Sequence, residues 1–351
     1  MGRTRTRRSD RLLDAVNGRS QILIVTHDNP DPDAIAGGWV LRLLFRRLLG
    51  RSARLVAGGA IVRAENRQFV ERLKPPIELV QMIDVESDAA VILVDCGVEA
   101  ANHLLAGSRV RPLAMIDHHP SSTGGVRLPF RDLRTGVAAC ASITASYLRE
   151  QSLEPRRRLA TALVYAIRTE TRGVRSQHSR LDRSVLMWLS PRADPTWLAQ
   201  IENAPLSKTY FGDLALALQN TFLYHDAALC YLPRATGAEI VGEVADLLIR
   251  SEGVRRVLCG AVVKHDLVIS VRTRPGGLDA ANLARSVLSG IGGGGGHLHR
   301  AGGSARVKTI TERTKGTLRD ELRRRWLTAC NQTGQRGRRL VPRREMMRAL
   351  A

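Results

Sequence analysis

The chain has 351 residues and a formal net charge of +21, and 44% of its residues are hydrophobic. This length suits two domains of ordinary size, and the apolar fraction excludes disorder throughout. No apolar run approaches the roughly 18 residues that a membrane-spanning helix needs, so we exclude an integral membrane protein and expect no membrane partner. The five cysteines are scattered without a CxxC pair, which indicates reduced core thiols and a cytoplasmic location.

The positive charge is concentrated at the two ends of the chain. Residues 1–11 carry five Arg and one Asp, and residues 334–351 carry six Arg and one Glu, so the ends supply nine of the 21 net charges. Arg and Lys neutralise phosphates, so nonspecific nucleic-acid contact by these tails is a candidate function. Aromatic residues make up only 4% of the chain, which is poor material for stacking single-stranded bases. Charge alone leaves nucleic-acid binding open.

The first half of the chain alternates apolar strands with helical patterns. We predict strands at residues 21–27, 54–59, 90–96 and 111–117, and helices at residues 34–49, 63–73 and 98–106. Continuous apolar strands separated by helices predict a mainly parallel sheet with helices on both faces. Ligands of such sheets bind beyond the carboxyl ends of the strands.

Helical patterns dominate residues 137–222, and a second α/β pattern follows. Its predicted strands lie at 228–233, 257–263 and 267–274, and its predicted helices lie at 238–251, 279–289 and 311–330. The predicted parts are a basic N-terminal arm at 1–18, an α/β domain at 19–190, a helical linker at 191–222, a smaller α/β domain at 223–330 and a basic tail at 331–351. We expect the last eighteen residues to be mobile. The fold class is α/β, with the active site expected in the cleft between the two domains.

Carboxylates and imidazoles follow three of the predicted strands at their carboxyl ends. They are His27, Asp31 and Asp33 after the first strand, Asp95 after the third, and Asp117, His118 and His119 after the fourth. Each piece alone has a plainer structural reading, as a helix cap or a polar turn. In a parallel sheet, however, the three strand ends share one edge, and this mixture of ligands suits a divalent ion such as Mn²⁺ better than Ca²⁺.

The ordered set His27-x3-Asp31-x-Asp33, Asp95 and Asp117-His118-His119 resembles the DHH phosphoesterase superfamily. That family includes RecJ-type exonucleases, nano-RNases that also dephosphorylate 3′-phosphoadenosine 5′-phosphate, cyclic-dinucleotide phosphodiesterases and manganese pyrophosphatases. The segment GGGGGHLHRAGG at 292–303 resembles the GGGH motif of the family's associated C-terminal domain. The resemblance covers about residues 19–310. It implies a catalytic DHH domain at 19–190 and a substrate-binding domain at 223–330.

The resemblance also implies two Mn²⁺ ions in one active site, with Mg²⁺ as a substitute. Its ligands would be His27 and Asp31 for the first ion, Asp33 and His118 for the second, and Asp95 as a bridge between them. Asp117 would orient His118, and His119 would reach toward the phosphate or the leaving group. A water between the two ions would attack phosphorus, and no Ser or Cys nucleophile is needed.

The sequence departs from the family at its fourth motif, where an Asp ligand is usual. The matching stretch AIRTETRGVRS at 166–176 places Glu170 at that position. A glutamate is one methylene longer and still able to bind a metal, directly or through water. The alternative is a helix-end glutamate paired with Arg168 or Arg172.

The glycine-rich segment predicts a second part of the binding site. Its candidate substrate-binding residues are Gly294, Gly295, Gly296, His297 and Gly302, joined by Arg272. Glycines let backbone N–H groups approach a phosphate or a nucleobase closely. A flexible linker is the alternative for the glycine run, and a solvated strand residue is the alternative for Arg272.

Together these features predict a Mn²⁺-dependent phosphohydrolase acting on short oligonucleotides or small nucleotides. Within the family, a nano-RNase or 3′-phosphoadenosine 5′-phosphate phosphatase ranks first, and a cyclic-dinucleotide phosphodiesterase second. A RecJ-like single-strand exonuclease ranks third and a pyrophosphatase last. A nucleic-acid-binding protein on a degenerate DHH scaffold is the non-enzymatic alternative. The resemblance makes a homodimer a candidate assembly.

Overall fold

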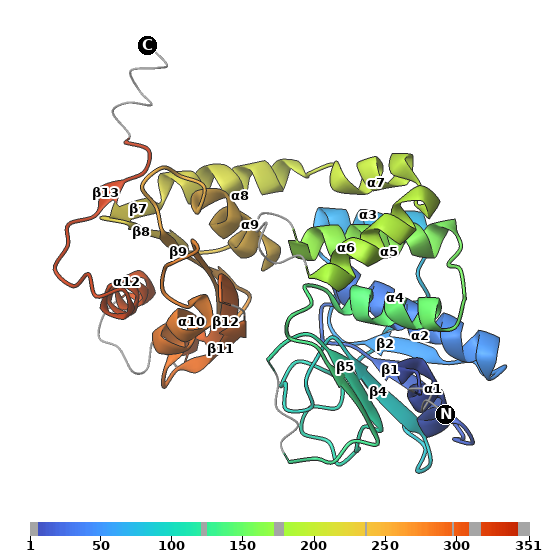
Figure 1. Ribbon diagram of the computed structural model, residues 1–351. Helices are drawn as coiled ribbons and strands as arrows, with labels where there is room; N and C mark the ends of the chain where they lie inside the picture. Colours follow the sequence, from blue (N-terminus) through green and yellow to red (C-terminus); the bar gives the residue numbers. More distant parts are fainter. Residues whose placement is uncertain are drawn as a thin grey trace. The chain divides into compact units, whose positions relative to one another are not determined.

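The computed structural model describes residues 6–120, 125–171, 179–235, 237–296, 298–308 and 317–342. The chain divides into two compact units, Met1–Pro205 and Leu206–Ala351 (Figure 1). This division falls inside the segment 191–222 that we expected to be a linker.

The first unit is built on a parallel sheet of six strands in the order β3-β2-β1-β4-β5-β6. The strands are β1 Ile22–Val25, β2 Arg54–Ala57, β3 Ile77–Leu79, β4 Ala90–Val94, β5 Ala114–Asp117 and β6 Phe130–Leu133. Both β1 and β4 are buried along their whole length, as their continuous apolar sequences require when both faces are covered. The predicted α/β fold with a mainly parallel sheet is therefore confirmed.

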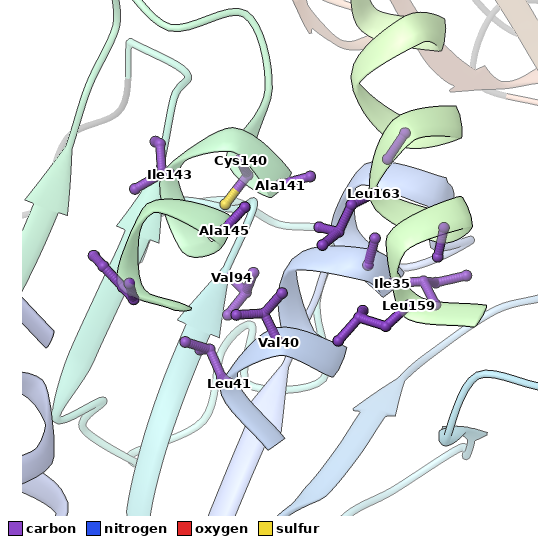
Figure 2. Packing of buried hydrophobic residues seen from close by; sticks show 14 of the residues in the cluster. Ile35, Val40, Leu41, Val94, Cys140, Ala141, Ile143, Ala145, Leu159 and Leu163 are labelled. Atoms are coloured by element: carbon purple, nitrogen blue, oxygen red, sulfur yellow. The ribbon is translucent and has the colours of Figure 1, made fainter. Parts of the chain in front are cut away.

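Helices cover one face of this sheet. They are α1 Arg8–Val16, α2 Pro32–Leu48, α3 Ala64–Leu73, α4 Cys140–Glu150, α5 Arg157–Thr171, α6 Arg180–Leu189, the 3-10 helix η2 Ser190–Arg192 and α7 Pro195–Glu202. Figure 2 shows the centre of this core, where Ile35 and Leu41 of α2 pack with Ile143 of α4 and Leu163 of α5. Val94 of β4 lies under them, so the strand that leads to Asp95 is fixed by core packing.

The opposite face carries Leu23, Val25 and Leu93, which pack against chain segments between the strands. The helix predicted at 98–106 is wrong, because these residues form turns and a short bridge instead. The Asp28 N–H donates to the carbonyl of Asn102, at 2.6 Å, and His103 pairs with His27. Backbone groups of this segment that would form hydrogen bonds within a helix instead form hydrogen bonds with the end of β1.

The N-terminal arm contains helix α1, and its residues Leu12 and Val16 are fully buried in the core of the first unit. Arg8 at its start pairs with Asp132 of β6, with Nη1 and Oδ1 2.5 Å apart. Over the residues that the structure describes, the arm is thus packed on the first unit, against β6 of its sheet.

The second unit holds a mixed sheet of seven strands in the order β11-β12-β10-β9-β8-β7-β13, in which only the β8–β9 pair is parallel. The strands are β7 Thr221–Tyr224, β8 Ala227–Leu232, β9 Arg256–Val263, β10 Asp266–Thr273, β11 Gly292–Gly296, β12 Arg300–Arg306 and β13 Arg338–Arg339. The helices are α8 Lys208–Gln219, α9 Glu239–Leu248, α10 Ala280–Leu288 and α12 Leu318–Ala329. Helices α8 and α9 pack on one face, and α10 and α12 pack on the other.

Part of the C-terminal tail is ordered against this sheet. Arg338 and Arg339 pair with Leu223 and Phe222 of β7, and the Arg339 guanidinium lies 5.0 Å from the centre of the Phe222 ring. The expectation of mobility is therefore wrong for this part of the tail. Residues 343–351 lie outside the described residues.

All five cysteines are buried free thiols, as their scattered positions predicted. Within the described ranges, we find no helix with the length and apolar character to span a membrane.

Candidate metal centre

The end of β1 and the start of α2 supply the first two candidate ligands. Asp31 is the N-cap of α2, and its Oδ1 accepts the N–H groups of Asp33, at 2.9 Å, and Ala34, at 3.1 Å. Nε2 of His27 lies 3.9 Å from the same oxygen. Asp31 thus caps the helix and also faces an imidazole, so its position suits both a helix cap and a metal ligand.

Asp95 follows β4 directly and occupies the centre of the site. Its φ of +60° lies in the left-handed region, which is uncommon for a residue with a side chain and is often found at functional sites. Its Oδ2 lies 3.7 Å from Nε2 of His27, and its Oδ1 lies 3.2 Å from Nε2 of His118 and 3.5 Å from Nδ1 of His119. Oδ1 is buried, and none of these contacts has hydrogen-bond geometry.

Two groups of potential ligands meet at this carboxylate. One group is His27, Asp31 and Asp95, and the other is Asp95, His118 and His119, with the ligand atoms of each group within 4.8 Å of one another. Asp95 belongs to both, so its position suits a carboxylate bridging two ions. Carboxylate and imidazole donors together suit divalent ions of the Mn²⁺ type.

The two imidazoles of His27 and His118 are oriented by backbone carbonyls. Nδ1 of His27 lies 2.9 Å from the carbonyl of Asp28, and Nδ1 of His118 lies 3.2 Å from the carbonyl of Val137. A carbonyl only accepts, so each Nδ1 carries a proton and each Nε2 faces the carboxylates. A metal ligand is usually fixed in this way through its second ring nitrogen, and the donor set therefore fits a divalent ion.

Asp33 is almost completely buried and is held by the start of α4. Its two carboxylate oxygens accept the N–H groups of Cys140, at 2.8 Å, and Ala141, at 2.7 Å. Because α4 has no side-chain cap of its own, Asp33 from α2 satisfies its first amides. Nε2 of His118 lies 3.6 Å from Oδ2 of Asp33, as expected of two side chains that share an ion.

Asp117 contacts both of the histidines that follow it, and its predicted orienting of the His118 ring stays a prediction. Its Oδ1 accepts the backbone N–H groups of His118 and His119, and it lies 2.8 Å from Nδ1 of the His119 ring. Nδ1 of the His118 ring lies against the Val137 carbonyl. The strand ends at Asp117, so its short side chain accepts the two following amides and also contacts the His119 ring.

The charges of the site raise the pKa values of its imidazoles. Burial alone would lower the pKa of His118, but Asp95, Asp33 and Glu170 outweigh it and raise that pKa to about 10. Burial is likewise outweighed at His27, where Asp31 and Asp95 hold the pKa well above its usual value. The same imidazoles lower the pKa of Asp95 against the effect of its burial. Without a metal ion the carboxylates are thus compensated by protons on His27 and His118.

Glu170 lies in the last turn of α5 and is half-buried. Its charge contributes to the raised pKa values of both Asp33 and His118, so the residue is close to the metal-binding groups. Direct coordination by Glu170 stays a prediction.

The glycine run of the second unit forms an edge strand, β11, and so is not the flexible linker that was its alternative interpretation. Gly294 and Gly295 pair with Gly303 and Gly302 of β12. A Cβ at Gly294 would lie 3.2 Å from the Gly302 carbonyl oxygen, whereas one at Gly295 would meet nothing within 4 Å. One face of the strand therefore packs closely and the other is open. Gly296 ends the strand with a φ of +141°.

Arg272 lies on β10 of the same sheet and is already paired. Its Nε donates to Oδ1 of Asp246 at 2.6 Å, and its Nη1 donates to Ser270 Oγ at 2.6 Å. Arg300 binds the other oxygen of Asp246 at 3.1 Å. Contact between Arg272 and a substrate phosphate stays a prediction. His297 lies outside the described residues.

The sequence reasoning missed the side chains that flank the metal-binding groups on the β2 side, notably Asp28, Gly58 and His103. A signal was present for Gly58 and Gly59, because a glycine pair follows a predicted strand at the same sheet edge. Nothing in the sequence indicated that His103 would lie beside His27.

The parallel sheet with carboxylates and imidazoles at one edge defines an α/β protein with a candidate dinuclear metal centre. Residues 21–167 match the family described as "DHH family, N-terminal domain". Residues 21–167 therefore form a domain of the DHH family, and the resemblance seen in the sequence is confirmed for this domain. A match of the second unit to the family's GGGH domain stays a prediction.

One relative and two solved structures are similar to the chain over most of its length. The chain is 30% identical over 296 residues to an uncharacterized protein of Methanocaldococcus jannaschii; the match covers 82% of this chain and 58% of that protein. An exopolyphosphatase-related protein from Bacteroides fragilis has a TM-score of 0.71 at 17% identity, covering 92% of this chain and 95% of that one. RecJ from Thermus thermophilus, in complex with Mn²⁺, has a TM-score of 0.55 at 14% identity, covering 92% and 54%. At these identities the structural similarity shows a shared fold.

Proposed function

We propose that this protein is a Mn²⁺-dependent phosphohydrolase that cleaves phosphoester bonds in short oligonucleotides or small nucleotides. The observation that carries the proposal is the buried carboxylate of Asp95, shared by two groups of metal-binding side chains. Membership of the DHH family and the Mn²⁺ complex of the Thermus RecJ support the choice of ion and reaction.

In this proposal His27 and Asp31 hold one ion, Asp33 and His118 hold the other, and Asp95 contacts both. When bound, such ions would lower the pKa of a coordinated water and neutralise charge that develops on the phosphate. The protein keeps the ligand atoms in place through the α2 cap, the start of α4 and the carbonyls behind the imidazoles. These supports are backbone groups, so they stay in place when charge develops on the substrate.

His119 has a separate task. Burial would lower its pKa, but the hydrogen bond with Asp117 and the charge of Asp95 outweigh this and raise it. The raised pKa favours the protonated form of the ring, and Asp117 fixes its Nδ1. We assign to His119 a contact with a phosphate oxygen or the donation of a proton to the leaving oxygen.

The second unit would bind the rest of the substrate through the open face of β11, whose Gly293 and Gly295 leave the backbone uncovered. The preference for short substrates is part of the proposal. Longer single strands, as cut by a RecJ-type enzyme, are the competing substrate, since β13 consists of two exposed arginines, Arg338 and Arg339.

The test is a substrate panel with purified protein in Mn²⁺ and in a chelator. It contains a ribodinucleotide, a deoxyribodinucleotide, a cyclic dinucleotide, 3′-phosphoadenosine 5′-phosphate, polyphosphate and a long single strand. We expect Mn²⁺-dependent release of a mononucleotide from a dinucleotide. Asp31→Ala should lower kcat/KM by about 100-fold or more, which is typical of losing one preorganised charge in an active site.

Asp84→Ala is the matched control, because Asp84 is an exposed aspartate of the same unit, outside both metal-binding groups. It should retain wild-type turnover. If no substrate of the panel were hydrolysed in Mn²⁺, the enzymatic proposal would be wrong and binding without catalysis would replace it.

A further inference from the structure

A cavity of about 660 Å³ lies in the first unit at the same sheet edge as the metal-binding groups. The segments that follow β1, β2 and β3 form it, together with the segment after β4. The lining residues that matter here are Asp28, Gly58, Leu79, Val80, His103 and Leu104. A cavity of this size is typical of a small-molecule site, and neither the sequence analysis nor the family resemblance assigned it a ligand.

Asp28 presents a carboxylate to this cavity without a bound donor. Its backbone is fixed, because its N–H donates to Asn102 and the next residue donates to the Gly58 carbonyl at 3.0 Å. A Cβ on Gly58 would lie 2.2 Å from Oδ1 of Asp28, so the carboxylate lies directly against the glycine. Over the described residues this carboxylate has no hydrogen bond or ion pair, and it belongs to neither metal-binding group.

The other walls of the cavity are uncharged. Leu79, Val80 and Leu104 supply apolar surface, and Leu79 is 43% exposed. Nδ1 of His103 accepts the N–H of Leu105 at 3.2 Å, and a ring nitrogen that accepts carries no proton, so this geometry is that of a neutral ring. Among the described residues no lysine or arginine lines the cavity, so it offers no cationic side chain to a phosphate. The chemistry suits an uncharged group with hydroxyl donors and a flat apolar part, as in a nucleoside.

The order of the strands matches the order of groups in a nucleotide. Asp28 follows His27, a candidate metal ligand after β1, whereas Leu79 and Val80 lie at the end of β3. These strands are two positions apart in the sheet, and thus roughly 10 Å apart at about 4.8 Å per strand. A nucleotide with its phosphate at His27 would therefore bring its sugar to Asp28 and its base to the apolar wall.

We propose that this cavity binds the nucleoside attached to the phosphate at the metal centre, and that Asp28 accepts hydrogen bonds from the ribose hydroxyls. The protein would then prefer ribonucleotides to deoxyribonucleotides. This inference rests on the proposed function and names the substrate class of the same site. Acidic side chains bind ribose hydroxyls in the same way at the strand ends of other α/β nucleotide sites.

The test measures binding of adenosine 5′-monophosphate and its 2′-deoxy analogue by calorimetry in Mn²⁺. We expect the wild type to bind the ribonucleotide about tenfold or more tightly, as a hydrogen bond to a charged acceptor predicts. Asp28→Ala should reduce this ratio to within about twofold, and Asp28→Asn, which keeps one neutral acceptor, should give an intermediate ratio. Asp84→Ala is the control and should keep the wild-type ratio.

Gly58→Ala gives an independent variant, because its methyl group would displace the Asp28 carboxylate while every polar group remains. It should lower the ribose preference in the same direction as Asp28→Ala. Dinucleotide turnover of the same preparations separates the two claims. Absence of turnover would refute the proposed hydrolase activity, whereas the binding ratio would still test the nucleoside site. A wild-type ratio within twofold, or a ratio unchanged in Asp28→Ala, would overturn the nucleoside site.

Discussion

Metal binding to this protein should release protons, because the histidines of the site are protonated in the metal-free protein and must lose a proton to bind a metal ion. The pKa of His118 is raised to about 10, and that of His27 is raised well above its usual value. Both Nε2 atoms face the shared carboxylate of Asp95. A divalent ion has to displace the proton from each ring before the nitrogen can bind it.

The size of the effect follows from the pKa of His118. Removing a proton from a group with a pKa of about 10 at pH 7 costs about 4 kcal/mol, at 1.36 kcal/mol for each pH unit. The ion that uses His118 should therefore bind about 1,000-fold more weakly at pH 7 than to a ring that is already neutral. Between pH 6 and 7, each of the two Kd values should fall about tenfold.

Calorimetry in buffers of different ionisation enthalpy measures the protons released as Mn²⁺ binds. We expect about two protons per chain at pH 6.5 when both positions fill, and about one fewer in His118→Gln. If no protons were released and the Kd values did not change with pH, the electrostatic account of the site would be refuted.

Three further predictions concern stability. Asp132→Ala should lower the free energy of unfolding by about 3 kcal/mol, measured in urea, because it removes a fully buried carboxylate that two arginines and the buried Tyr147 share; a loss below 1 kcal/mol would contradict this. Gly292→Ala should lower it by about 1–3 kcal/mol, since its Cβ would lie 2.2 Å from the Ser304 carbonyl oxygen, whereas Gly293→Ala meets nothing within 4 Å and should be nearly neutral. Burial would raise the pKa of Asp226, but its arginine partner outweighs this and lowers it; the resulting stability is present above the unfolded pKa of about 3.9 and lost as the pH falls below it. Thermal unfolding between pH 3 and 6 should therefore depend less on pH in Asp226→Asn, and an unchanged profile would exclude this role.

The stability of the metal-free protein should fall as the pH rises, whereas its affinity for metal ions should increase. The raised pKa of His118 contributes stability that is complete below about pH 6.5 and is lost as the pH rises toward about 10. The midpoint of thermal unfolding in chelator should fall over this interval. A midpoint that rose instead would show that the ring is neutral in the metal-free chain.

The positions of the candidate ligands could be predicted from the sequence because strong local signals fix them. The strands before His27, Asp95 and Asp117 are continuous apolar runs, and a parallel sheet brings their carboxyl ends to one edge. Strands β6 and β11 could not be predicted, because their sequences lack such local signals. Strand β6 has the sequence FRDL, and β11 is all glycine, so both depend on pairing partners and not on local preference.

Side-chain partnerships could not be predicted in the same way. The contact of Asp117 with the ring of His119 depends on how the backbone turns after the strand end. The turns at 98–106 are rich in alanine and leucine, which favour a helix, yet their backbone binds the end of β1. The nucleoside cavity depends on the close approach of Asp28 to Gly58, which no periodicity reveals.

The measurement that tests the central claim most directly is the number of Mn²⁺ ions bound per chain in the wild type and in Asp95→Asn. Because Asp95 belongs to both metal-binding groups, the wild type should bind two ions, and the substitution should weaken both. The matched variant Asp31→Asn keeps an acceptor for the α2 cap and should weaken one ion only. A wild type that bound no Mn²⁺, or an Asp95→Asn variant that kept either ion at wild-type affinity, would contradict the shared carboxylate.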